Sequence, residues 1–459
     1  MTETLQQAFQ ELSRQISNEQ LKRPRLTTVR RIVQKEDRPY SPYTETSTEL
    51  DISFPPSPLS LHDKKVDEPI LVNGRAPSKH LDVEDKMHER RDQYGFRLPT
   101  QWVSLAHFRR VEDRYQHMLQ RQSIKWKQFL AQDNHQWPTR SPKLKRYARR
   151  GIPQELRGKA WMHYSGAKAK MNQEPDLYDT LLEKLDTLHP HNEYAEMIQR
   201  DLHRTFPDNT RFCCAVTSAD GSTTMIPEIN DELQKLRRVL LAFTLYSPDI
   251  GYCQSMNFLV GYFLLFVTEV EAFWLLVVLV HDYFPKNMFD ETMEGAHIDQ
   301  AVLMMLIYEK IPTVWNRIAP RRCFWECEQA NNLPPSTLVT SHWFFTLFVN
   351  ILPVETVLRV WDCLFIEGYE VMFRVALTVI KLSEEKICTA EDPMDALQIL
   401  QNTPRRMVDC HRLMEQVFSK EGIAADLSER DILQRRSILK NRSAQRKASC
   451  STSKPFPWF

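Results

Sequence analysis

The chain has 459 residues, of which 42% are hydrophobic and 26% are charged, as in ordinary globular proteins. Its 60 Lys and Arg residues against 59 Asp and Glu leave a net charge of +1, which argues against a surface that is basic throughout for nucleic acid. With only 11 glycines there is little room for glycine-rich phosphate loops, and no G-x-G-x-x-G or G-x-x-x-x-G-K-[ST] motif occurs. Nine scattered cysteines, an odd number, fit a reducing compartment better than a disulfide-stabilised protein.

The first 80 residues are rich in proline and poor in aromatic residues. A segment such as 53–58, with the sequence SFPPSP, cannot bury enough apolar surface to offset the entropy lost on ordering. We therefore predict that residues 1–80 are disordered. Residues 85–135 contain several aromatic residues among many charges, which predicts a helical segment that packs on the domain after it.

Residues 145–425 show helical periodicity in short segments that are separated by Pro, Gly or Asn. No alternating strand pattern recurs, so the predicted fold class is all-α, with many helices in this region. The most apolar stretch, 256–280, is interrupted by Glu269 and Glu271 into pieces too short to span a bilayer. Since the N-terminus also lacks the apolar core of a secretory signal, we expect buried helices in a cytosolic protein.

The composition changes again after residue 428. Seven Lys and Arg residues and no acidic residue lie between Arg435 and Lys454. This pattern predicts that residues 428–459 form a flexible basic tail, and contact with an anionic membrane surface is the alternative. We accordingly expect a piece of about residues 85–425 to fold without either end of the chain.

One dipeptide suggests metal chemistry. His281 and Asp282 follow an apolar helix, as the metal-binding pair does in helical phosphohydrolases. With 14 histidines in the chain, about one His-Asp neighbour is expected by chance, and no convincing set of further ligands lies nearby in sequence. A metal-dependent hydrolase is therefore a minor alternative to a polar helix end.

Two polar segments are more informative. In the first, Asp201 and Arg204 are three residues apart and share a helix face with Ile198. Pro207 is expected to stop the helix soon afterwards, which would leave Arg204 at its C-terminal end. Taken alone, such a pair is a surface ion pair worth about 0.3–0.5 kcal/mol.

The second segment is Gly251-Tyr252-Cys253-Gln254. Pro248 and Gly251 predict a turn, after which Gln254 is expected to open an apolar helix. Taken alone, Gln254 would be an ordinary residue at the start of a helix.

Together, Ile198-x-x-Asp201-x-x-Arg204 and Tyr252-x-Gln254 resemble the paired signature of TBC-domain proteins, the GTPase-activating proteins of Rab GTPases. The resemblance covers roughly residues 145–420 and is strongest to the growth hormone-regulated TBC protein type. One departure is Ser255, where the family commonly has Gly. The other matching blocks follow in the order of the family: Arg150-Gly151-Ile152-Pro153, Leu156-Arg157-Gly158 with Trp161, Glu271-Ala272-Phe273-Trp274, Leu352-Pro353-x-Glu355, Leu358-Arg359-x-Trp361-Asp362 and Glu367-Gly368.

The resemblance implies two catalytic residues that act on a partner. Arg204 would supply a guanidinium to the phosphates of GTP, and Gln254 would orient the attacking water in place of the glutamine of the GTPase. Asp201 would hold Arg204, and Tyr252 would pack against Gln254 and position it. The remaining motif residues are assigned to the scaffold: Ile198, Gly251, Arg157 and Trp161.

The resemblance also implies a GTP-bound Rab-family small GTPase as partner. No cofactor or metal of its own is expected, because Mg²⁺ and GTP arrive with that partner, and nucleic acid is not expected to bind. The protein would be an activator that supplies catalytic residues in trans, acting in vesicle-mediated transport from the cytoplasm and meeting membranes transiently through the Rab. A Rab-binding scaffold without catalysis is the alternative, although a scaffold needs neither catalytic residue.

Overall fold

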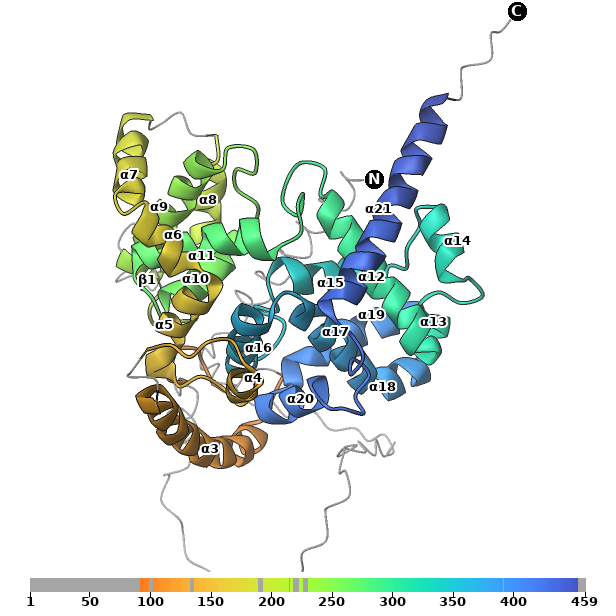
Figure 1. Ribbon diagram of the computed structural model, residues 1–459, viewed down its shortest axis with the longest axis horizontal. Helices are drawn as coiled ribbons and strands as arrows, with labels where there is room; N and C mark the ends of the chain where they lie inside the picture. Colours follow the sequence, from red (N-terminus) through yellow and green to blue (C-terminus); the bar gives the residue numbers. More distant parts are fainter. Residues whose placement is uncertain are drawn as a thin grey trace, which may run out of the picture. The chain divides into compact units, whose positions relative to one another are not determined.

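The computed structural model describes residues 91–452 apart from short gaps (Figure 1). The predicted disorder of residues 1–80 and the last residues of the predicted tail lie outside the described part of the chain. The gaps are residues 99–101, 133–135, 189–192, 214, 218–222, 226–229 and 391.

The described chain is almost entirely helical, which confirms the predicted all-α class. The first helices are α3 (Leu105–Gln132), α4 (Pro142–Arg149), α5 (Gln154–Ser165), α6 (Ala167–Gln173), α7 (Leu177–Leu188) and α8 (Ala195–Leu202). The only sheet among the described residues is an antiparallel pair of short strands, β1 (Ala215–Thr217) and β2 (Thr223–Met225).

The sheet is followed by α9 (Asp231–Tyr246), α10 (Met256–Leu264), α11 (Glu269–Val278) and a π-helical turn, η2 (Leu279–Tyr283). The next group is α12 (Glu294–Lys310), α13 (Pro312–Ile318), α14 (Phe324–Gln329), α15 (Ser336–Phe345), α16 (Val354–Glu367) and α17 (Glu370–Leu382). The last elements are α18 (Glu384–Thr389), α19 (Pro393–Asn402), the 3₁₀ turn η3 (Pro404–Arg406), α20 (Cys410–Val417) and α21 (Glu429–Thr452).

Local sequence explains several helix ends. The Asn230 side chain accepts a hydrogen bond from the backbone N–H of Leu233 and so caps α9. Gly166 ends α5 with a left-handed φ of 87°, which glycine adopts without steric cost. Pro153 stands at the N-cap of α5.

The core is built around helices that are apolar on every side. Nearly all side chains of α10 and α11 are buried, and both helices pack on α9. Helix α16 packs on α4 and α5, so that the ring centres of Trp161 in α5 and Trp361 in α16 lie 5.6 Å apart. These contacts join residues about 200 positions apart in sequence.

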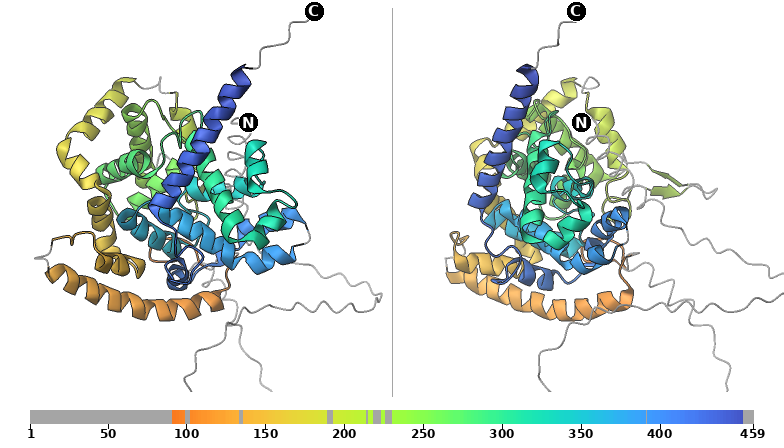
Figure 2. Two further views of the ribbon diagram at one scale, coloured as in Figure 1. Left: turned by 45° about the vertical axis from the view of Figure 1, so that its right-hand side comes forward. Right: turned by 90° about the vertical axis from the view of Figure 1, so that its right-hand side faces the viewer.

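Helix α3 lies outside this core and covers α4 (Figure 2). Its Trp126 and Phe129 are buried in a small second cluster with Leu144 and Ala148 of α4. The indole N–H of Trp126 donates to the carbonyl oxygen of Gly151 at 2.9 Å, so the ring is held by a polar contact as well as by packing.

Residues 429–452 differ from the predicted flexible tail, because they form α21, which packs on α12. Ile432 and Leu439 of α21 are buried, and the cations of α21 form ion pairs with acidic side chains of α12 and α14. These acids are far from α21 in sequence, so composition alone misled the prediction. The ion pairs join Arg435 to Glu309, Arg436 to Asp299, Arg442 and Arg446 to Glu328, and Lys447 to Glu294.

The apolar stretch 256–280 is divided between α10 and α11. None of the helices in the described residues is both long enough and apolar enough to cross a bilayer.

Candidate functional site

Asp201 and Arg204 meet at the end of α8. The helix stops at Leu202, so Arg204 lies in the turn after the helix. The position of Pro207 had suggested that the helix continues far enough to place Arg204 at its C-terminal end. Its guanidinium forms an ion pair with Oδ1 of Asp201, whose side chain is fully buried, whereas 17% of the Arg204 side chain is exposed. A cation is therefore held at the surface by a carboxylate beneath it.

Asp201 also joins the two motifs. The hydroxyl of Tyr252 donates to Oδ2 of Asp201 at 2.5 Å, across 51 positions of sequence. Burial raises the pKa of the Asp201 carboxyl, while Arg204 and the hydrogen bond from Tyr252 oppose that shift. Burial also raises the pKa of Tyr252 well above its usual value, so the phenol keeps the proton that it donates. Tyr252 thus contacts Asp201 directly, a partner that the motif alone did not suggest.

Gln254 lies in a turn two residues before α10, and does not itself open the helix. Its side-chain Nε2 is buried and has no hydrogen-bond partner among the described residues. A buried amide nitrogen without a partner is uncommon in folded proteins, and such groups often mark a place where a ligand or water binds. The donor capacity of this amide is therefore unused within the described part of the chain.

Ser255 explains why the family commonly has Gly at its position. Its φ is 119°, in the left-handed region that residues with a Cβ rarely adopt. Its hydroxyl is also buried and without a hydrogen-bond partner in the described part of the chain. The serine is tolerated at the start of α10, but the backbone there has the conformation of a glycine.

A second polar bridge, which the sequence alone did not reveal, connects the segments that carry the two motifs. Nδ2 of Asn257 donates to the hydroxyl of Thr205 at 2.8 Å, and that hydroxyl donates to the carbonyl oxygen of Asp201 at 2.7 Å. The backbone N–H of Ser255 donates to Oδ1 of Asn257 at 3.3 Å. All four side chains are buried, so the turn after α8 and the start of α10 are fixed to each other. The only signal in the sequence is a polar residue close to each motif, since Thr205 directly follows Arg204 and Asn257 lies three residues after Gln254.

The predicted scaffold residues of these two segments are also buried. Ile198 points from α8 into the core with no exposed surface. Gly251 has a φ of 63°, and a Cβ at this position would lie 2.2 Å from the ring of Tyr194. Only glycine allows the chain to pass so close to Tyr194 on its way to Gln254.

Arg157 belongs to a different cluster, in which Arg157 and Asp362 are buried and Glu355 is 18% exposed. Its Nε donates to Oδ1 of Asp362 at 3.0 Å, its Nη2 to Oε1 of Glu355 at 3.0 Å and its Nη1 to the hydroxyl of Tyr94 at 2.9 Å. The indole N–H of Trp161 donates to the same Oδ1 of Asp362 at 3.0 Å. Although burial disfavours its ionisation, the guanidiniums of Arg157 and Arg359 hold the pKa of Glu355 below its usual value. This cluster ties α5 to α16 and leaves Arg157 no access to a partner.

His281 and Asp282 contact different groups. His281 in η2 shares a hydrogen bond of 2.7 Å with the hydroxyl of Ser247, and Asp282 forms an ion pair of 2.9 Å with Lys170. Within the described ranges, no three His, Cys, Asp or Glu side chains are grouped as a metal ion requires.

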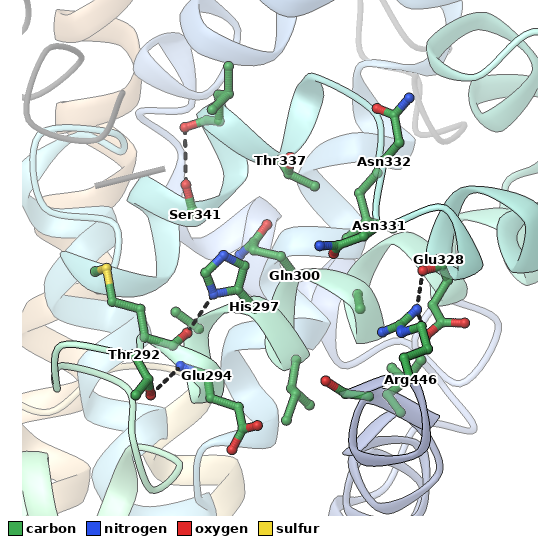
Figure 3. A pocket seen from close by; sticks show the side chains of 18 of the residues that line it. Thr292, Glu294, His297, Gln300, Glu328, Asn331, Asn332, Thr337, Ser341 and Arg446 are labelled. Carbon is green, nitrogen blue, oxygen red and sulfur yellow. Dashed lines mark hydrogen bonds and ion pairs between the residues drawn. The ribbon is translucent and has the colours of Figure 1, made fainter. Parts of the chain in front are cut away.

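A cavity of about 540 Å³ lies elsewhere, between α12, α15 and α21 (Figure 3). Arg446 and Glu328 form one wall, and on another Nδ1 of His297 donates a hydrogen bond to the carbonyl oxygen of Met293 at 2.8 Å. None of the residues of the two motifs lines it. The residues singled out from the sequence therefore gather at the α8 and α10 segments and not at this cavity.

Comparisons with known proteins agree with this arrangement. The family model described as the Rab-GTPase-TBC domain matches residues 154–388, which include both motifs. Growth hormone-regulated TBC protein 1 from Homo sapiens is 38% identical over 334 residues, covering 72% of this chain and 90% of that protein. GTPase-activating protein GYP3 from Saccharomyces cerevisiae is 33% identical over 405 residues, covering 75% of this chain, and the chain spans 62% of that yeast protein.

A solved structure is similar as well. The TBC domain of a flagellar RabGAP from Chlamydomonas superposes with a TM-score of 0.56 at 27% identity, covering 72% of this chain and 99% of that domain. The similarities of sequence and of fold confirm the resemblance that the motifs indicated. The chain belongs to the Rab-GTPase-TBC domain family.

Proposed function

We propose that the protein is a GTPase-activating protein for a Rab-family small GTPase and that it supplies Arg204 and Gln254 to the nucleotide site of that partner. The observation that carries the proposal is the double connection between the two motifs. Tyr252 reaches Asp201, and Asn257 reaches Thr205, so the segments that carry the arginine and the glutamine are held as one unit. A unit of this kind can present both side chains together with little loss of entropy.

Arg204 has the chemistry that phosphate groups require. GTP hydrolysis develops charge on the phosphate oxygens, and an arginine supplied in trans raises the rate by about 10³–10⁵ in related GTPases. A guanidinium stays charged and offers several planar N–H donors, of which Asp201 engages only part. The remaining donors make no hydrogen bond to the described residues, and the partly exposed side chain can offer them to the phosphates of a bound partner.

Gln254 has the chemistry that positioning a water requires. A neutral amide donates and accepts hydrogen bonds without taking a proton from the nucleophile. The Gln254 Nε2, which lacks a partner among the described residues, supports this role. The partner brings Mg²⁺ with its GTP, and the activator meets the membrane transiently through the Rab, from the cytoplasm.

The test is single-turnover GTP hydrolysis, first across a panel of purified Rabs and then on the most responsive one. A Rab whose own catalytic glutamine is replaced by leucine should still be stimulated, because Gln254 takes over that role. Gln254→Ala should be severely impaired on both forms of the Rab, whereas Gln416→Ala, which changes an exposed glutamine on α20, should act like the unaltered protein.

Two outcomes would contradict the proposal. Resistance of the Gln→Leu Rab together with an active Gln254→Ala protein would remove Gln254 from the mechanism. Tight binding to a GTP-bound Rab without any stimulation would instead indicate a non-catalytic scaffold.

A further inference from the structure

Helix α3 presents a basic face to solvent. Six cationic side chains of this helix are exposed, against a single exposed acid, Asp113. The whole chain has a net charge of only +1, so the exposed side of this helix is far more basic than the chain as a whole. The six cations are Arg109, Arg110, Arg114, Arg121, Lys125 and Lys127.

The cations of α3 differ from those of α21 in having almost no acidic partners. Among the described residues, only Arg114 approaches a carboxylate, Asp409, at 3.7 Å, and 72% of the Arg114 side chain is still exposed. The other five make no ion pair with the described residues. In α21, by contrast, Arg436 meets the buried Asp299 at 2.6 Å, and four further cations are paired with acids in the same way.

The six cations also lie on one side of the helix. At about 100° per residue they fall within an arc of roughly 160°, opposite the face that buries Trp126 and Phe129. Ile124 lies inside this arc, and 57% of its surface is exposed. Figure 2 shows α3 at the periphery of the described helices. The outer face of α3 thus combines unpaired cations with one exposed apolar side chain.

We infer that the outer face of α3 docks on an anionic membrane surface. Lys and Arg side chains near such a surface each strengthen binding by about fivefold, and an apolar side chain among them enters the boundary between headgroups and acyl chains. A nucleic acid would use the cations but would leave Ile124 exposed to water. The inference goes beyond the proposed function, in which the Rab alone brings the protein to a membrane.

The test measures sedimentation of the full chain with vesicles of phosphatidylcholine, with or without phosphatidylserine. One variant carries Arg109→Gln, Arg110→Gln, Arg121→Gln, Lys125→Gln and Lys127→Gln. A matched control removes the same five charges at exposed positions on other elements: Lys159→Gln, Lys184→Gln, Arg317→Gln, Lys386→Gln and Lys420→Gln. Both sets leave the core untouched, so both variants should unfold at the temperature of the unaltered protein.

The unaltered protein should bind only the vesicles that contain phosphatidylserine. The α3 variant should bind at least about tenfold more weakly, while the control should stay within about threefold of the unaltered protein. Equal weakening of both variants would show that net charge alone acts, and would overturn the inference. Absence of vesicle binding, with α3-dependent binding of a DNA duplex instead, would overturn it in favour of nucleic acid.

Stimulation of a Rab without a lipid anchor, measured in solution, should be the same for all three proteins. The inference and the proposed function can therefore fail independently of each other.

Discussion

Arg157 and Arg204 both pair with a buried aspartate, yet the fold holds them in different ways. Arg157 is 1% exposed, and its guanidinium donates to Asp362, Glu355 and the hydroxyl of Tyr94. Each of its nitrogens has a partner inside the protein, so nothing remains for a ligand. Arg204 is 17% exposed and is held from one side only, by Asp201. Two properties therefore distinguish an arginine that joins helices from one that can bind a partner. They are the number of guanidinium N–H donors already used inside the protein and the exposure of the side chain to solvent.

Arg436 shows that exposure alone does not make this distinction. Its side chain is 18% exposed, almost the same as that of Arg204. However, it donates to both oxygens of Asp299, at 2.6 and 2.9 Å, and lies over the rings of Tyr369 and Phe373. Arg436 is therefore fixed in spite of its exposure, which predicts a role in stability and none in hydrolysis.

The largest expected effect is at Arg204. Arg204→Ala should lower the stimulated rate of GTP hydrolysis by about 10³-fold or more, because no other group replaces the guanidinium at the phosphates. Arg204→Lys should be nearly as inactive, since an ammonium lacks the planar set of donors. The measurement is single-turnover hydrolysis at a temperature where both variants are folded, with thermal unfolding in parallel. Arg204→Lys, which keeps a cation beside Asp201, should unfold like the unaltered protein, whereas Arg204→Ala should be less stable because the buried Asp201 keeps only its hydrogen bond from Tyr252. Near-normal stimulation by Arg204→Ala would show that Arg204 does not act on the partner, and the proposed difference between Arg204 and Arg157 would then be wrong.

The second effect is at Arg157. Arg157→Met should lower the free energy of unfolding by about 3–5 kcal/mol, because Asp362 and Glu355 would stay buried without their cation. Urea unfolding measures the loss, and Arg317→Met, at an exposed site on α13, is the matched control, with an expected change within about 0.5 kcal/mol. If the two variants were equally stable, the buried cluster would not hold α5 to α16.

The third effect is at Arg436. Arg436→Met should lower the free energy of unfolding by about 2–3 kcal/mol, since it leaves the buried Asp299 without its hydrogen bonds. Stimulated hydrolysis at a temperature where the variant is folded should be unchanged. A loss of stimulation with unchanged stability would mean that α21 serves the partner rather than the fold.

The smallest effect is at Tyr252, which supports Arg204 indirectly. Tyr252→Phe should lower the maximal stimulated rate about five- to tenfold, or about 1–1.4 kcal/mol, with little change in the Rab concentration needed for half-maximal rate. This is less than the full value of a hydrogen bond to a charged group, because Tyr252 acts on Arg204 only through Asp201. The pH dependence gives a second readout. The Tyr252 hydrogen bond lowers the pKa of Asp201, against the effect of burial, so its loss should raise that pKa.

As the pH falls, the variant should therefore lose activity at a higher pH than the unaltered protein, because protonated Asp201 no longer pairs with Arg204. Identical acid limbs in the two pH profiles would argue that Asp201 does not anchor the arginine.

The helices could be predicted from sequence, and the candidate site residues could be singled out, because both leave local marks. The leucine stripe of α7 and the apolar runs of α10 and α11 need only neighbouring residues to be recognised. The two motifs are also short, and the structure brings them together through Asp201 and Tyr252.

What could not be predicted depends on residues far apart in the chain or on backbone conformation. The order in α21 depends on acidic residues of α12 and α14 that lie more than 100 positions away in sequence. The local sequence of α21 contains no sign of these distant partners, so it cannot distinguish a paired basic helix from a flexible basic tail. The bridge between Thr205 and Asn257 spans 52 positions. The left-handed backbone at Ser255 cannot be recognised from a serine, which seldom adopts it.

The packing of α21 also affects how the protein is made. Arg436 follows Asp299 by 137 positions, which a ribosome translates in roughly 7–27 s at about 5–20 residues per second. During that interval α12 has left the ribosome, but the helix that neutralises and covers it has not been synthesised. Until α21 is made, a nascent chain of this protein therefore leaves the acids of α12 and the apolar surface beside them uncovered for many seconds.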